Sequence, residues 1–279
     1  MRLFALATLM IVQVGLQACQ AKPAPARGVG APLEMAREGK LIATLNRAAI
    51  EAKVKPVTLT AYDPYYARTK TYRAFPINLL LEAGFGIPSA ELAKQEWILR
   101  ALDGYAVTMS GERLLETGGH IAFEDVEVPG WEPIGPTHAN PGPYYLVWEK
   151  DTQRDEESYP RPWQLARLEI APFETLYPHV APTGAPGAAQ RGFAIFKAQC
   201  IRCHMINREG GKVGPELNVP KNVTEYRDLD YLRTFIKNPW AFRYSAMPPM
   251  THLSDAQIDD IFAYFTAMKG LKHNKDEGP

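Results

Sequence analysis

The chain has 279 residues, in which 31 Lys and Arg balance 31 Asp and Glu, so its formal net charge at pH 7 is zero. This balance leaves no basic footprint for nucleic acid, and we expect no nucleic-acid partner. The length favours two domains, and the 46% of hydrophobic residues suits a globular protein.

The first residues predict export. Residues 1–19 carry one early basic residue, Arg2, before an apolar run that is short for a membrane span and ends in Leu16-Gln17-Ala18-Cys19. This pattern resembles a bacterial lipoprotein signal, which implies that Cys19 is lipidated and begins the mature chain. An ordinary secretory signal cut nearby is the alternative. Residues 20–32, rich in Pro and Ala, predict a flexible tether.

Residues 33–178 predict an α+β domain with a mixed or antiparallel sheet. Helices are expected at residues 34–46 and 75–83, the second with Pro76 near its start and Gly84 at its end. Asp103-Gly104 is a two-residue hairpin signal between two of the expected strands. Strands are expected at residues 57–61, 97–102, 105–109, 144–148 and 162–170.

Short motifs in this domain resemble the sulfite-oxidase-type molybdopterin-binding fold. They are Arg73-Ala74-Phe75-Pro76, Leu102-Asp103-Gly104-Tyr105 and the run from Pro141 to Val147. The resembling family ligates molybdenum with a cysteine thiolate, and this domain contains no cysteine. We therefore expect a relative of the fold without the cofactor.

Two histidines give this domain a weaker candidate site. His120 and His138 lie near Glu124, Asp125 and Glu127 in the sequence, and imidazole with carboxylates can bind metal or transfer protons. Nearness in sequence says little about a site, so we expect these histidines and carboxylates to be surface loop residues without a catalytic or metal-binding role.

Residues 179–188 are rich in Pro and Gly and predict a linker. Beyond it stands Cys200-Ile201-Arg202-Cys203-His204, the attachment signature of c-type haem. One helical turn presents the two thiols to the porphyrin vinyl groups, and the adjacent imidazole then falls beneath the iron. A redox dithiol or half of a zinc site are the alternatives, but the βαβ context and the further ligands they need are missing.

The following residues make residues 189–272 resemble a class I c-type cytochrome, an all-α domain. The resemblance implies one covalent haem c held by Cys200 and Cys203, with His204 as the proximal iron ligand. It also implies that the Pro215 carbonyl, in the Gly214-Pro215 loop, accepts the second N–H of that imidazole. The Met247-Pro248-Pro249 step matches the distal loop of the family and implies Met247 as the sixth ligand, with Met250 and His252 as local competitors.

The last helix is well marked. Ser254 and Gln257 form a capping box, and an apolar stripe at helical spacing follows it. Gly270 stands where a left-handed C-terminal glycine belongs. The resemblance further implies a close crossing with the first helix, residues 189–199, in which Gly192 and Phe196 lie against Ile261 and Tyr264.

Together these patterns predict an exported monohaem c-type cytochrome in the periplasm, anchored to a membrane through Cys19. We expect it to carry single electrons between periplasmic redox proteins or a membrane oxidoreductase complex, and no catalytic residue is assigned. The alternative is a haem-bearing oxidoreductase, whose first domain oxidises a small substrate and passes electrons to the haem. A haem-based sensor is a third hypothesis for its function.

Overall fold

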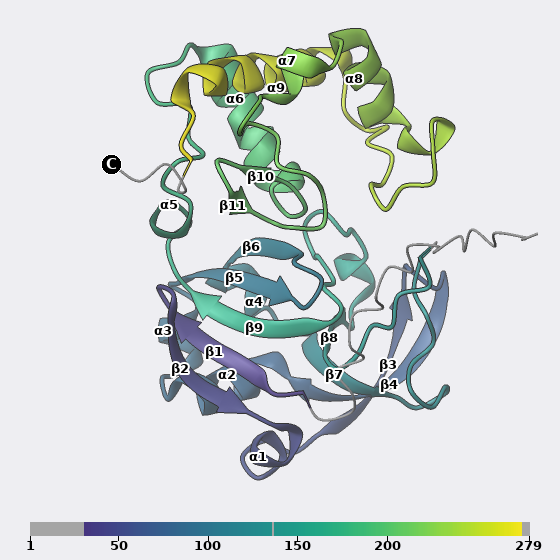
Figure 1. The fold of residues 1–279 in the computed structure, drawn as a ribbon. Helices are drawn as coiled ribbons and strands as arrows, with labels where there is room; N and C mark the ends of the chain where they lie inside the picture. Colours follow the sequence, from purple (N-terminus) through teal and green to yellow (C-terminus); the bar gives the residue numbers. More distant parts are fainter. Residues whose placement is uncertain (1–30, 136, 275–279) are drawn as a thin grey trace, which may run out of the picture.

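The computed structural model describes residues 31–135 and 137–274. The expected signal, Cys19 and most of the expected tether fall outside these residues. The chain forms a β-rich part, up to about residue 176, and a helical part from residue 187 onward (Figure 1). This arrangement confirms the predicted α+β domain followed by a helical domain.

The β-rich part contains a five-stranded sheet with the strand order β2-β1-β9-β5-β6. Strands β1 and β9 pair in parallel and the other neighbours are antiparallel, so the sheet is mixed, as predicted. The strands are β1 (Leu33–Arg37), β2 (Lys40–Leu45), β5 (Glu96–Ala101), β6 (Ala106–Ser110) and β9 (Leu165–Ile170).

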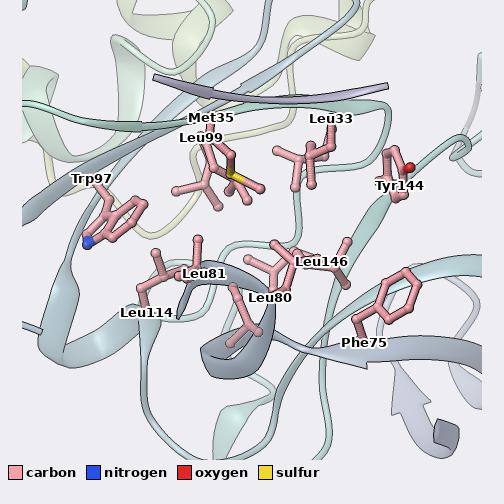
Figure 2. Packing of buried hydrophobic residues seen from close by; sticks show 14 of the residues in the cluster. Leu33, Met35, Phe75, Leu80, Leu81, Trp97, Leu99, Leu114, Tyr144 and Leu146 are labelled. Atoms are coloured by element: carbon pink, nitrogen blue, oxygen red, sulfur yellow. The ribbon is translucent and has the colours of Figure 1, made fainter. Parts of the chain in front are cut away.

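A second, antiparallel sheet has the order β3-β4-β7-β8. Its strands are β3 (Val57–Asp63), β4 (Arg68–Pro76), β7 (Gly119–Asp125) and β8 (Tyr145–Trp148). The main core of this part lies around α2 (Ile77–Phe85), where Leu80 and Leu81 point toward Met35 and Leu99 of the five-stranded sheet (Figure 2). Short helical turns complete it: α1 (Arg47–Glu51), α3 (Ser89–Leu92), α4 (Gly111–Leu114), η1 (Asp151–Gln153) and α5 (Phe173–Leu176).

The expected strands are found near their predicted positions, but the helix predicted at residues 34–46 is wrong. That segment is the antiparallel hairpin of β1 and β2, which turns at Glu38 and Gly39, both with positive φ. The apolar residues Leu33 and Met35, two positions apart, both point into the core, which is the spacing of a strand. The segment is short, so its apolar residues also fit a helical spacing. The second expected helix exists as α2, with Pro76 as its N-cap and Gly86, rather than Gly84, as its left-handed C-cap.

The helical part begins with α6 (Gly187–Ile195), which continues into a π-helical turn, η2 (Phe196–Cys200). Helix α9 (Asp255–Met268) crosses α6 so closely that a Cβ on Gly192 would lie 1.9 Å from the Asp260 carbonyl oxygen. The rings of Phe196 and Tyr264 are 5.2 Å apart, so the predicted crossing is confirmed. The other elements are β10 (Met205–Ile206), β11 (Glu209–Gly210), α7 (Val223–Tyr226), α8 (Leu229–Lys237), η3 (Pro239–Ala241) and η4 (Lys269–Leu271).

Both ends of α9 were predicted, one correctly. Ser254 and Gln257 form the reciprocal capping box. The left-handed C-terminal glycine is wrong, because the chain continues from Lys269, which is right-handed, into the 3₁₀ turn η4 that contains Gly270. Among the described residues, no helix has the length and apolar character needed to cross a membrane.

Strand β5 is buried on both faces and joins the two parts of the protein. Trp97 and Leu99 belong to the core around α2, whereas Ile98, between them, belongs to an apolar cluster that also contains Phe196 and Ile261 of the helical part. The helical part therefore packs on the sheet face opposite α2 (Figure 1). Within the expected linker, Val180 is fully buried and its carbonyl accepts a hydrogen bond from Tyr264 Oη at 2.8 Å.

Candidate haem-attachment site

The Cys-x-x-Cys-His motif lies where the first long helix ends. The N–H of Ile201 bonds to the carbonyl of Phe196 at 2.9 Å, five residues back, so the helix widens into a π turn as it reaches Cys200. Such turns are rare and often occur at functional sites. A tight turn follows, in which the N–H groups of Cys203 and His204 both bond to the Cys200 carbonyl, at 3.1 and 2.9 Å. This geometry places both thiols and the imidazole on a short, well-anchored segment.

The imidazole of His204 is fixed on one nitrogen. Its Nδ1 lies 3.0 Å from the Pro215 carbonyl oxygen, which can only accept, so Nδ1 carries the proton and Nε2 keeps its lone pair. Burial lowers the pKa of His204, against the opposing effect of the Pro215 carbonyl, and favours the neutral ring that a metal needs. Gly214 packs closely against the ring, where a Cβ would approach His204 Cε1 to 2.5 Å.

The two thiols are free and half-buried. Burial raises the pKa of Cys200 to about 12 and that of Cys203 to about 11. A redox dithiol depends on a lowered thiol pKa, so this environment disfavours that alternative. In residues 31–135 and 137–274, no three His, Cys, Asp or Glu side chains are grouped as a metal site would require.

The three candidates for the sixth ligand differ in their surroundings. Met250 packs against the apolar cluster of α6 and α9, and its N–H bonds to the Ile236 carbonyl at 3.1 Å. The Nε2 of His252 is hydrogen-bonded to Gln199 Oε1 at 2.8 Å. Met247 is half-exposed, and its N–H bonds to Ser245 Oγ at 3.1 Å. The assignment of Met247 as ligand stays a prediction.

The surroundings of the motif and of the loop that carries Met247 fit a haem. Next to the Gly214-Pro215 turn, Val213 is 41% exposed, and the segment between α8 and α9 exposes Trp240, Phe242 and Tyr244 at 55, 44 and 71%. Exposed large apolar side chains such as these are typical of a surface that binds an apolar ligand, and a porphyrin macrocycle is broad and mostly apolar. The two thiols and the metal-ready imidazole of the motif are the donor set that haem c requires.

The histidines of the β-rich part do not assemble a site. The ring of His120 bonds to the Gly118 carbonyl at 3.1 Å, and His138 sits in an exposed turn. The carboxylate of Asp125 instead meets the buried Lys70 ammonium at 2.8 Å. Glu127 pairs with Arg68 at 2.7 Å, so these carboxylates serve an ion-pair network.

The sequence did not indicate that the β5–β6 turn touches the haem motif. The N–H of Ala106 bonds to the Arg202 carbonyl at 2.9 Å, and the N–H of Lys212 bonds to the Gly104 carbonyl at 2.8 Å. The hairpin signal at Asp103-Gly104 was visible, but nothing in it named a partner a hundred residues further along the chain. The β5–β6 turn of the β-rich part is therefore hydrogen-bonded to the backbone of the haem motif and of the segment that follows it.

Comparison with known families matches residues 187–265 to cytochrome c oxidase, cbb3-type, subunit III. The match covers most of the helical part, including both cysteines, His204 and Met247, and less than a third of the chain. No curated protein matches the chain. Residues 187–265 are a cytochrome c domain, which implies a covalent haem c and electron transfer. The resemblance of residues 33–178 to the molybdopterin-binding fold stays a prediction.

Proposed function

We propose that this protein is an exported monohaem c-type cytochrome that carries single electrons between redox partners outside the cytoplasm. The observation that carries the proposal is the motif geometry: two free thiols on one turn, with an imidazole whose Nδ1 is held at 3.0 Å by the Pro215 carbonyl. The family match over residues 187–265 supports it.

Each residue of the site has one task. Cys200 and Cys203 would hold the haem through thioether bonds, and His204 would bind its iron. Pro215 orients the ring and strengthens its donation. Met247 supplies a soft, neutral sixth ligand that favours ferrous iron.

Haem supplies one-electron chemistry when bound, and with both His204 and Met247 as iron ligands no iron position would remain for a substrate. The arrangement therefore favours a carrier over an enzyme that turns over substrate at iron.

The compartment follows from the chemistry proposed for the first residues. Lipid on Cys19 would hold the protein at a bacterial membrane, with both described parts in the periplasm. Its partners would be soluble redox proteins or a membrane oxidoreductase complex, and the matched family, named for an oxidase subunit, supports the second class. A mature N-terminus found by sequencing at any residue other than Cys19 would refute lipidation.

The ligand assignment is tested by comparing Met247→Ala with Met250→Ala in the haem-loaded protein. Oxidised His/Met iron shows a weak sulfur-to-iron absorption band in the far red. We expect Met247→Ala to abolish this band and to lower the reduction potential, because a ligand favouring ferrous iron is lost. Met250→Ala should keep the band, and the reverse pattern would contradict the assignment.

A further inference from the structure

Three side chains form a hydrogen-bonded chain from the β-rich part to the segment between η3 and α9, residues 242–254, which carries Met247 and is here called the distal loop. Gln199, the residue before Cys200, donates from Nε2 to Glu157 Oε1 at 2.9 Å. The Oε1 of the same amide lies 2.8 Å from His252 Nε2. Glu157 belongs to the segment between β8 and β9, and His252 lies between Met247 and α9. The haem motif thus stands between two segments that are far apart in the sequence.

The chemistry of Glu157 sets the direction of both bonds. An ionised carboxylate can only accept, so the amide of Gln199 must turn its NH₂ group toward Glu157. Its carbonyl oxygen then faces His252, and the imidazole must carry its proton on Nε2 in order to donate. Glu157 therefore fixes the orientation in which the Gln199 amide accepts the hydrogen bond from His252.

Glu157 is presented from an ordered turn. The Asp155 carboxylate accepts the Ser158 N–H at 2.9 Å, and the Asp155 carbonyl accepts the Tyr159 N–H at 2.8 Å. The Glu157 carbonyl accepts a further bond from Arg202 Nη2 at 3.0 Å. The turn thus contacts Gln199 and Arg202, which flank Cys200 on either side.

The other attachments of the distal loop run to α8 and to the apolar cluster of the helical part rather than to Gln199. Met250 bonds to the Ile236 carbonyl, and Leu253 is buried, with 2% of its surface exposed. The bond from His252 to Gln199 connects the loop to the segment that carries the covalent haem bonds. Loss of this bond would release the loop on the side of the motif while its attachment to α8 remained.

We propose that Glu157 and Gln199 are positioning residues, through which the β-rich part keeps the distal loop attached to the segment that carries the haem-attachment motif. The inference rests on the proposed function, since it requires a haem and a distal ligand in this loop. With haem bound and Met247 on its iron, opening of this loop would withdraw Met247 and leave the iron accessible to an external ligand. The strength of the chain from Glu157 to His252 then sets how often this happens.

The test measures imidazole binding to the oxidised, haem-loaded full-length protein. Gln199→Ala and His252→Ala should each tighten imidazole binding by about three- to tenfold. This factor corresponds to the net free energy of one or two exposed hydrogen bonds. The double variant should bind no more tightly than either single one, because both changes break the same contact. Glu157→Gln should act in the same direction but less strongly, because its amide can meet Gln199 in either orientation.

Glu174→Gln is the matched control. Glu174 pairs with Lys197 Nζ at 3.0 Å, so this change weakens another contact between the two parts, two residues from Gln199. It should leave imidazole binding unchanged. An equal rise in Glu174→Gln would indicate general loosening and overturn the proposal.

Unchanged binding in Gln199→Ala would also overturn it, and unchanged binding in Glu157→Gln would remove the β-rich part from the mechanism. If Gln199→Ala fails to fold, Glu157→Gln and His252→Ala decide the matter. Failure of the proposed function is distinguishable, because wild-type protein would then lack covalent haem or the sulfur-to-iron band.

Discussion

The crossing of α6 and α9 at Gly192 gives the sharpest stability prediction. Alanine at this position would place its Cβ 1.9 Å from the Asp260 carbonyl oxygen and 2.4 Å from the carbonyl carbon. Both atoms are backbone, so no side-chain rotation relieves the clash and the helices must separate. Overpacking of this kind costs about 1–3 kcal/mol or more, and the better helix propensity of alanine returns at most about 1 kcal/mol. We expect Gly192→Ala to lose about 2 kcal/mol, roughly 4–8 °C in melting temperature.

The assay is guanidinium unfolding of the haem-loaded protein, followed by far-ultraviolet circular dichroism and by haem absorbance. Gly187→Ala is the control, because it makes the same substitution in the same helix where the nearest atom, Arg191 Nη1, lies 3.7 Å away. The control should be neutral or slightly stabilised, whereas Gly192→Ala should show a lower midpoint at an unchanged slope. Equal midpoints for the two variants would refute the close crossing.

Two further predictions concern the β-rich part. Ile98→Ala should leave a cavity in the cluster shared by the two parts and lower the free energy of unfolding by about 2–4 kcal/mol. Haem absorbance and far-ultraviolet dichroism should still change in one transition. Two separate transitions, only one of them shifted, would contradict a shared core. Burial raises the pKa of Tyr144 to about 12, so its protonated form favours the folded state, and the free energy of unfolding should fall between about pH 10 and pH 12. Tyr144→Phe should flatten this fall in base titrations, and an unchanged slope would contradict the burial argument.

The parts of the fold that local chemistry determines could be predicted. The hairpin turn at Asp103-Gly104 joins β5 and β6, and the Ser254 capping box begins α9. The hairpin of β1 and β2 could not be predicted, because its strands are short and its turn, Glu38-Gly39, was not recognised as one. The parallel pairing of β1 with β9 joins Glu34 to Arg167, a separation over which no local pattern acts.

The candidate site divides in the same way. The Cys-x-x-Cys-His motif and the Pro215 turn lie within fifteen residues of each other, so their spacing could be interpreted directly. The contacts of Glu157 with Gln199 and of Gly104 with Lys212 depend on how two distant parts meet, and nothing in either segment identified the other. The sequence did contain one signal of such a meeting, the consecutive apolar residues Trp97, Ile98 and Leu99, which are all buried in the structure. A strand with an apolar run of this kind is covered on both faces.

The most direct test of the central claim is the mass of the tryptic peptide that contains Cys200 and Cys203, taken from protein made in a host that attaches haem c. Our account predicts a peptide heavier by one haem, with the haem retained under denaturing electrophoresis and absent from the Cys200→Ser, Cys203→Ser double variant. Recovery of the unmodified peptide, with haem extracted by acid acetone, would contradict it.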